Sequence, residues 1–299
     1  MRVRVNEPEQ ILATLDEFGR LEGLPFMPKM VEYCGREFTV TRWVNNVCFQ
    51  VPGGADFGNL EDSVLLDVAR CDGESFGNCQ LGCPLIWKTR WLTPIDSSSD
   101  ESNQTTDEPE DQVSAASELV QLATLNSKGT GGKVFCQATQ LQKISQARPR
   151  FDLGQYSDEL SLNRVSTISM ATSFCSGMLA RVRKQNSVVG TLKKTPVSNL
   201  DLQVGETVRV KSQDEIVATL DENGKNRGLW FDPLMLRYCQ QELKVTKRIT
   251  VLVDEVNGVV RELKIPSVVL EDLKCEPGRR RFCSRLLHLF WREIWLDRV

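Results

Sequence analysis

Histidine is nearly absent from this chain of 299 residues, in which His288 is the only one. A serine–histidine–aspartate triad needs an imidazole, so none is expected in the N-terminal or middle part of the chain. Histidine-rich zinc sites and non-haem iron sites are excluded within one chain for the same reason. We interpret His288 itself as a surface or interface side chain near the last strand.

Long apolar runs and an excess of basic charge are also missing. No stretch approaches 18 apolar residues, so the sequence predicts no membrane span. The formal net charge of -3 argues against a dedicated nucleic-acid binder. Residues 1–8 are charged and lack an apolar core, so we expect no secretory signal and a cytoplasmic protein. No glycine-rich phosphate loop or dinucleotide fingerprint is present.

An internal repeat is the strongest pattern in the sequence. Residues 3–40 align with residues 208–245 without a gap, and both contain the run ATLDE. The match resumes after a shift of one residue, where it pairs Cys71 with Cys275, Cys79 with Cys283, Trp87 with Trp291, Trp91 with Trp295, and Leu92 with Leu296. The two matching stretches are separated from their counterparts by nearly the same number of residues, so we predict that the same module lies at both ends of the chain.

Each module has the pattern of a small β-structure. Apolar and charged residues alternate over Val3 to Val5, as in a half-buried strand. Ser212 and Glu215 have the spacing of a capping box, and Asn223-Gly224 is a turn signal. We expect several short strands joined by tight turns, with the two tryptophans of the final segment WREIWL in the core. The predicted fold is therefore mainly β, with two duplicated small SH3-like barrels.

The sequence between the modules changes composition twice. Residues 97–132 contain SSSDESNQTTDEPEDQ and are acidic and rich in serine and threonine, which predicts a disordered linker. Within it, Ser114 to Leu125 has the composition of a transient helix. Residues 133–205 form a partly helical connecting region, with helical spacing of apolar residues from Phe151 to Lys184. The predicted domains are thus 1–96, the 97–132 linker, the 133–205 connection, and 206–299.

Three segments carry a family resemblance. They read ILATLDEFGRLEGLPFMPKMVEYCG, KVFCQATQL and FCSRLLHLFWREIWLDRV. In these motifs the chain resembles a family of uncharacterised bacterial proteins with duplicated terminal modules, along most of its length. The acidic linker and the middle region depart from that pattern. The resemblance implies no particular activity.

The cysteines are unevenly distributed, and three of the ten form the pattern C-x7-C-x3-C at Cys71, Cys79 and Cys83. In a reducing compartment, clustered cysteines indicate metal ligands or reactive thiols before disulfides. Glycines in the loop allow the backbone to fold around an ion. Tetrahedral zinc needs four ligands, and the fourth candidate is Cys136 in KVFCQATQL.

Several interpretations of these cysteines remain open. Cys34 and Cys48 are alternative fourth ligands. The simplest interpretation is three free thiols in a loop, followed by a zinc site, an iron–sulfur cluster, and a redox disulfide. The second copy has Leu287 in place of the third cysteine of the cluster, so we expect no metal there. Cys34 and Cys239 follow tyrosine and are expected to pack in the cores.

Two further patterns have simpler explanations than catalysis. The paired carboxylates Asp16-Glu17 and Asp221-Glu222 precede glycine turns, so turn chemistry is preferred to acid–base catalysis. The basic run Arg279 to Arg281 with Arg285 is expected to be a solvated loop.

The sequence identifies no reaction. We therefore expect a non-enzymatic interaction or scaffold protein with a protein partner, in which a cysteine-bound metal stabilises the first module. The alternatives are a metalloenzyme or iron–sulfur redox protein that uses the cluster, and an RNA-binding module in the second copy. The sequence leaves a small-molecule substrate unassigned.

Overall fold

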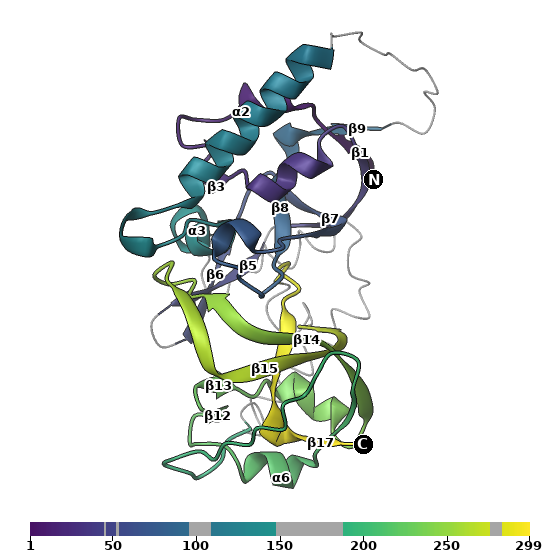
Figure 1. Cartoon of the computed structure of the whole chain (residues 1–299), viewed down its shortest axis with the longest axis vertical. Coiled ribbons are helices and arrows are strands. Elements are labelled where there is room, and N and C mark those ends of the chain that lie inside the picture. The colour runs from purple at the N-terminus through teal and green to yellow at the C-terminus, as the bar shows by residue number, and fades with distance from the viewer. Residues whose placement is uncertain (45, 52–53, 96–108, 148–187, 276–282) are drawn as a thin grey trace. The chain divides into compact units, whose positions relative to one another are not determined.

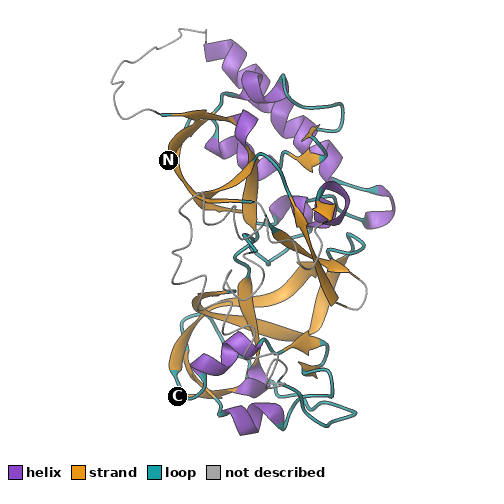
Figure 2. Ribbon diagram, turned by 180° about the vertical axis from the view of Figure 1, so that it is seen from behind, coloured by secondary structure: helices purple, strands orange, loops and turns teal. Residues whose placement is uncertain are grey.

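The structure, a computed structural model, describes residues 1–44, 46–51, 54–95, 109–147, 188–275 and 283–299 (Figure 1). In these ranges the chain is mainly β, as the sequence predicts, with curled antiparallel sheets (Figure 2). No helix in the described part is long and apolar enough to cross a bilayer. The chain divides into two compact units. Unit 1 consists of Met1–Gln155, Leu252–Arg261 and Cys283–Arg285, and unit 2 of Tyr156–Val251, Glu262–Phe282 and Leu286–Val299.

In its described residues, unit 1 contains ten short strands besides the ends of two longer ones from the second copy. They are β1 (Arg2–Val5), β2 (Arg20–Leu21), β3 (Leu24–Pro25), β4 (Glu37–Trp43), β5 (Val47–Val51), β6 (Gly54–Asn59), β7 (Ser63–Arg70), β8 (Pro84–Lys88), β9 (Leu92–Pro94) and β10 (Gln146–Ala147). The helices and 3₁₀ turns described in this unit are α1 (Pro8–Leu12), η1 (Pro28–Tyr33), η2 (Glu74–Phe76), η3 (Thr89–Trp91), α2 (Pro109–Ser127), η4 (Thr130–Gly132) and α3 (Gln137–Ile144). The main sheet has the order β8-β7-β4-β1-β9, and a second sheet has the order β10-β6-β5.

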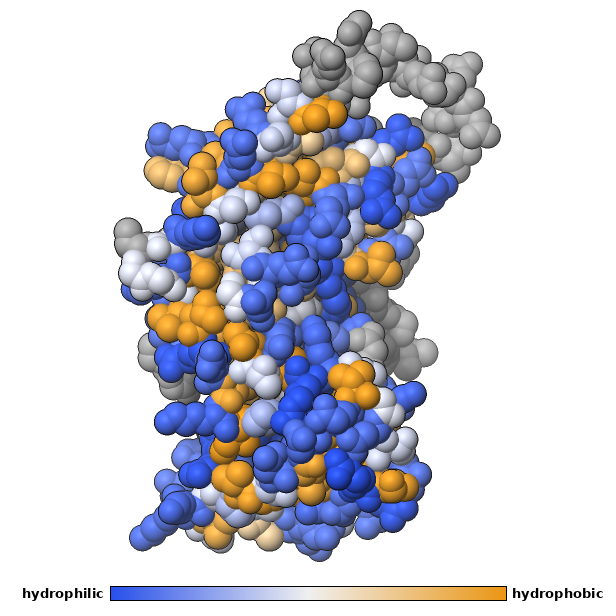
Figure 3. Space-filling model, viewed as in Figure 1, coloured by the Kyte–Doolittle hydropathy of each residue, from blue (hydrophilic) through white to orange (hydrophobic). Residues whose placement is uncertain are grey.

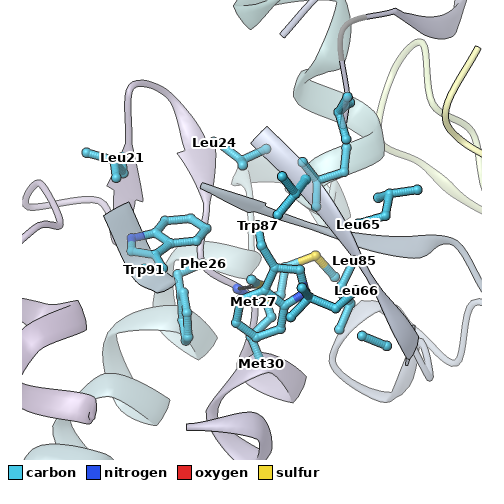
Figure 4. Packing of buried hydrophobic residues seen from close by; sticks show 14 of the residues in the cluster. Leu21, Leu24, Phe26, Met27, Met30, Leu65, Leu66, Leu85, Trp87 and Trp91 are labelled. Atoms are coloured by element: carbon cyan, nitrogen blue, oxygen red, sulfur yellow. Dashed lines mark hydrogen bonds between the residues drawn. The ribbon is translucent and has the colours of Figure 1, made fainter. Parts of the chain in front are cut away.

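The core of unit 1 is built around two tryptophans (Figure 4). Trp87 and Trp91 are fully buried, and Phe26 contacts both rings edge-to-face at centroid distances of 6.2 and 5.2 Å. The indole Nε1 of Trp91 donates to Thr14 Oγ1 at 3.0 Å, which satisfies that buried polar group. Val3 on β1 faces the same core, as its alternating pattern predicts.

Helix α2 overturns part of the predicted linker. The expectation of disorder over residues 97–132 is wrong for Pro109–Ser127, which is helical, whereas residues 97–108 lie outside the described residues. Ala115, Leu119 and Ala123 recur every four residues, so a helix places them on one face, and all three are buried. Leu119 joins the core of unit 1. The acidic, serine-rich composition indicated only a transient helix here, because it does not show which residues pack against the core.

The connecting region is described only in part. Helix α3 lies at the start of the predicted 133–205 connection, before the segment in which helices were expected. The helices expected from Phe151 to Lys184 lie outside the described residues. Unit 1 therefore extends beyond the predicted 1–96 module, because it also includes α2, α3 and two short segments of the second copy.

Unit 2 contains the elements of the second copy. Its strands are β11 (Thr207–Val210), β12 (Lys225–Asn226), β13 (Leu229–Trp230), β14 (Glu242–Val253), β15 (Val260–Lys274), β16 (His288–Arg292) and β17 (Leu296–Arg298), of which β14 and β15 continue into unit 1 at their joined ends. Its helical elements are α6 (Gln213–Val217), η5 (Pro233–Tyr238) and η7 (Glu293–Trp295). The main sheet has the order β16-β15-β14-β11-β17. Ser212 caps α6 through Glu215, as predicted.

The registers of the two main sheets can be compared directly. Val3 pairs with Phe38 in one sheet, and Val208 pairs with Leu243 in the other. Trp87 lies opposite Val64, and Trp291 lies opposite Val268. In each case the aligned residues of the sequence repeat occupy corresponding strands.

The segment WREIWL differs from its predicted continuous strand. The 3₁₀ turn η7 interrupts it between β16 and β17, so Trp291 and Trp295 do not share one strand face. Both side chains are nevertheless fully buried, which confirms their predicted place in the core. The turn lets Trp295 Nε1 donate to Thr219 Oγ1 at 3.0 Å.

Candidate functional site

The predicted cysteine cluster lies in the loop between β7 and β8. The backbone amide of Cys71 donates to the carbonyl of Cys83 at 2.8 Å, which closes the loop at its base. Phe76 on η2 is buried and anchors the loop to the core. Gly73 has a φ of 80°, and a Cβ at this position would overlap the Cys79 carbonyl. The loop conformation therefore requires glycine there.

The fourth predicted cysteine, Cys136, lies at the N-cap of α3. The buried Gln137 side chain fixes this helix end, because its Nε2 donates to the carbonyls of Pro25 and Ile86 at 3.1 and 2.8 Å. Gln137 Oε1 also accepts the Ile86 amide at 2.8 Å, so it binds β8 through both of its polar groups. The amide of Thr139 in the first turn of α3 hydrogen-bonds the sulfur of Cys136.

Two short segments of the second copy complete this part of unit 1. The amide of Val253 donates to Cys79 Sγ at 3.3 Å. The guanidinium of Arg285 forms a bidentate ion pair with Glu255, with N···O distances of 2.6 and 2.9 Å. Both side chains are about 95% buried. Nη2 of Arg285 also lies 3.8 Å from Cys83 Sγ, which places a cation beside this sulfur.

The four predicted cysteines share one small cavity of about 30 Å³. Its walls are mainly apolar and come from the cysteine loop, β8, α3 and the two second-copy segments. The residues that line it are Met27, Cys71, Phe76, Cys79, Leu81, Gly82, Cys83, Pro84, Leu85, Ile86, Cys136, Gln137, Ala138, Leu141, Val253, Glu255 and Arg285. Cysteines up to 65 positions apart in the sequence thus face one enclosed space.

The enclosure of these thiols favours their neutral form. Burial raises the pKa of Cys71 well above its ordinary value, and the neighbouring Cys83 adds to this effect. Burial raises the pKa of Cys83 to about 12, although the Arg285 guanidinium acts in the opposite direction. The pKa of Cys136 rises to about 11, mainly through burial, while amides of α3 oppose the shift. Without a bound cation, Cys71, Cys83 and Cys136 are therefore thiols rather than thiolates at neutral pH.

The remaining cysteine candidates lie elsewhere. Cys34 ends η1, where burial raises its pKa to about 12, and Cys48 on β5 faces Cys283. Neither residue lines the cavity. Among the described residues, no three histidine, cysteine, aspartate or glutamate side chains are grouped closely enough to hold a metal ion. The four sulfurs share a cavity, but the structure does not bring them to ligand distance.

Comparisons with known proteins add no assignment to this geometry. No family model, no curated protein and no solved structure matches the chain. The function must therefore be inferred from the residues of the chain itself.

The aligned segment of the second copy has the same backbone hydrogen bond between its two ends, without the third thiol, and residues 276–282 between them lie outside the described residues. The amide of Cys275 donates to the Leu287 carbonyl at 2.8 Å, just as Cys71 does to Cys83. Leu287 thus occupies the place of Cys83 and packs against the apolar core of unit 2. Because Leu287 aligns with Cys83, the second copy lacks the third cysteine of the cluster.

Sequence reasoning missed the ion pair of Arg285 and Glu255. Arg285 was grouped with a solvated basic run, but it is buried, whereas Arg279 to Arg281 lie outside the described residues. Its proximity to Glu255 and Cys83 arises from contacts over 30 and 202 positions, which no local pattern encodes. A lone arginine two residues after a cysteine was the available signal.

The paired carboxylates have the predicted structural role. Asp16 Oδ1 accepts the amides of Phe18 and Arg20 at 2.9 Å, and Asp221 Oδ1 accepts the equivalent amides of its own turn. His288 is half-buried on β16, near the end of the chain as expected. These groups explain turns and strands rather than a reaction.

Proposed function

We propose that unit 1 holds one zinc ion with Cys71, Cys79, Cys83 and Cys136, and that the protein is a non-enzymatic interaction or scaffold protein. The observation that carries this proposal is the shared cavity. Four cysteines from two separate segments, the β7–β8 loop and the start of α3, line it together. A thiolate set of four matches the ligand number of tetrahedral zinc.

Hydrogen-bond donors around the sulfurs support thiolate ligands. The sulfurs of Cys71 and Cys136 accept backbone amides of Gly73 and of α3, respectively. Cys79 Sγ accepts the Val253 amide, and Cys83 Sγ faces the Arg285 guanidinium. Donors of this kind stabilise the charged form of an acid and orient metal ligands. Each of the four sulfurs thus has a neighbouring hydrogen-bond donor.

A single ion and a cluster make different demands on the cavity. About 30 Å³ corresponds to the space of roughly one water molecule, which suits a single metal ion. An iron–sulfur cluster contains several iron and sulfide atoms and would need the walls to move apart. Four thiolates suit structural zinc and iron–sulfur clusters alike. We prefer zinc because a single ion needs no added inorganic sulfide, and metal analysis distinguishes the two.

Metal binding requires the four sulfurs to approach one another. The described residues show no preformed group at ligand distance, so closure of the β7–β8 loop around the ion is part of the proposal. Binding also requires deprotonation of thiols whose pKa burial raises, and it therefore releases protons. Metal affinity and folding of unit 1 are coupled, because ligation free energy also stabilises the fold.

A complete protein ligand set supports a structural role. Catalytic zinc sites keep an open position for water or substrate, whereas structural sites use four protein ligands. Figure 3 shows apolar side chains at the surface over the region where Figure 1 draws α2. Val113, Val120 and Leu125 of this helix are 71%, 41% and 73% exposed, which supports an interaction role. We propose a protein as the partner and a reducing, cytoplasmic compartment, in which free thiols persist.

We further propose that the two modules are duplicated SH3-like barrels. The strands of the first sheet, β8-β7-β4-β1-β9, correspond in order to β16-β15-β14-β11-β17. The aligned tryptophans Trp87 and Trp291 have corresponding partners across the sheet. Curled antiparallel sheets of short strands are the basis of such barrels.

Metal analysis of the purified chain tests the proposed site. Elemental analysis should find one zinc per chain, and the protein should be colourless. The Cys83→Ser variant should lose most of this zinc and stability in unit 1. The matched change Leu287→Ser, at the aligned position of the second copy, should leave zinc content unaltered. A brown protein with visible absorption bands would show an iron–sulfur cluster in place of zinc. A chain purified without any metal would contradict the proposed site.

A further inference from the structure

A second pair of cysteines, separate from the four that line the cavity, lies buried in unit 1. Cys48 is the second residue of β5, and Cys283 begins the short second-copy segment of this unit. The backbone amide of Cys48 donates to Cys283 Sγ at 3.1 Å. The two thiols are also hydrogen-bonded to each other. Their side chains are therefore in direct contact.

Neighbouring hydrogen bonds fix the separation of this pair. Ser284 donates through its amide to the Asn46 carbonyl and through its hydroxyl to the Trp43 carbonyl, each at 2.8 Å. Arg285 Nη1 donates to the Cys48 carbonyl at 3.0 Å. The two residues that follow Cys283 are thus hydrogen-bonded to the backbone at and just before β5. An amide-to-sulfur distance near 3 Å is compatible with the roughly 4.4–6.8 Å between Cα atoms that disulfides span.

We propose that Cys48 and Cys283 are an oxidisable dithiol, which forms an intramolecular disulfide by exchange with a small disulfide oxidant of the glutathione type. In the first step, the thiolate of one cysteine attacks the oxidant, forms a mixed disulfide and releases one reduced thiol. In the second step, the other cysteine attacks the protein sulfur of the mixed disulfide and releases a second reduced thiol. The protein loses two protons and two electrons, which reduce one oxidant molecule to two thiols.

Burial controls the rate of this reaction rather than its product. Cys48 is 4% exposed and Cys283 is 1% exposed, so the oxidant must react during local opening of the segment. Thiol contact and burial raise the pKa of Cys283 well above its ordinary value, which slows attack further. We therefore expect the disulfide to form slowly, and only during prolonged exposure to the oxidant.

The disulfide would have a defined structural consequence. It would link two residues 235 positions apart, and would thereby restrict the unfolded chain strongly. It would also fix Arg285, two residues from Cys283, beside Cys83 in the cavity. The proposed zinc ligands do not include either member of the pair, so this inference does not depend on the metal.

Peptide mapping after controlled oxidation tests the proposal. The full chain is incubated with oxidised glutathione, remaining thiols are alkylated, and proteolytic peptides are analysed by mass spectrometry. We expect a peptide pair joining Cys48 to Cys283, lighter by two hydrogens than the separate peptides and released by dithiothreitol. The oxidised chain should also unfold at a higher temperature than the reduced chain.

Three variants sharpen the experiment. Cys48→Ser and Cys283→Ser should each abolish the linked peptide and the oxidant-induced rise in unfolding temperature. Cys239→Ser, at a cysteine of unit 2, should leave both unchanged. The linked peptide should persist in the Cys83→Ser variant, whose zinc site is disrupted. Oxidation that joins other cysteines first, or glutathione that stays attached to Cys48 or Cys283 without a cross-link, would overturn the proposal.

Discussion

Removal of one charge from the buried ion pair of unit 1 should have a large, local effect. In Glu255→Gln, the Arg285 guanidinium keeps its charge but loses a bidentate partner at 2.6 and 2.9 Å. Both side chains are at most 5% exposed, so water cannot replace the carboxylate. Breaking such a buried pair costs about 3–5 kcal/mol. This free energy corresponds to a roughly 10²- to 10⁴-fold larger population of the opened unit.

Hydrogen exchange measured by mass spectrometry can assign this loss to unit 1. Amides of β7 and β8 should exchange faster in Glu255→Gln, while those of β11 should change little. The matched control is Glu242→Gln, which breaks an exposed ion pair of unit 2 with Arg209 and should cost about 0–1 kcal/mol. Equal effects of the two substitutions, or uniform loss over both units, would refute the assigned role of the buried pair.

Three further changes test other parts of the structure. Leu119→Ala should lower the free energy of unfolding by about 2–5 kcal/mol, measured by thermal unfolding, because this side chain of α2 is fully buried. The control Val120→Ala changes an exposed side chain of the same helix and should have little effect. Small and equal effects of the two changes would contradict the packing of α2 against the core. Gly73→Ala should destabilise the cysteine loop by about 1–3 kcal/mol through its positive φ, and unchanged urea unfolding would contradict this. Metal-free protein should lose stability as pH rises from about 8.5 towards 12, because the pKa values of Cys83 and Cys136 in the folded state, about 12 and 11, exceed the value in the unfolded chain. The unfolded thiols then lose their protons while the folded ones keep them, so the free energy of unfolding falls by up to about 1.4 kcal/mol per pH unit per thiol. A free energy of unfolding in urea that does not change over this pH range would contradict the prediction.

The strands and caps of the modules were accessible from the sequence because they depend on local patterns. Alternation identified β1 and β11, and the Ser212 capping box identified the start of α6. In contrast, η7 breaks the predicted last strand because Trp295 must reach both the core and Thr219. That requirement comes from tertiary packing, which a period of two in the sequence does not contain.

The candidate site was predictable for the cysteines but not for their surroundings. Spacing and glycine content indicated the loop from Cys71 to Cys83, and Cys136 followed as the nearest cysteine after it. All four line one cavity in the structure. Arg285 and Glu255 could not be assigned because the fold alone brings them to this place. Helix α2 was expected only as a transient helix over Ser114 to Leu125, because its few buried residues are diluted by a polar composition.

Zinc K-edge X-ray absorption of the purified chain tests the central claim most directly. The proposed site predicts a single shell of four sulfur ligands at about 2.3 Å from zinc. The same shell should remain in Leu287→Ser and should disappear or lose a sulfur in Cys83→Ser. A shell dominated by nitrogen or oxygen, or an unchanged four-sulfur shell in Cys83→Ser, would contradict the assignment of these cysteines as the metal ligands.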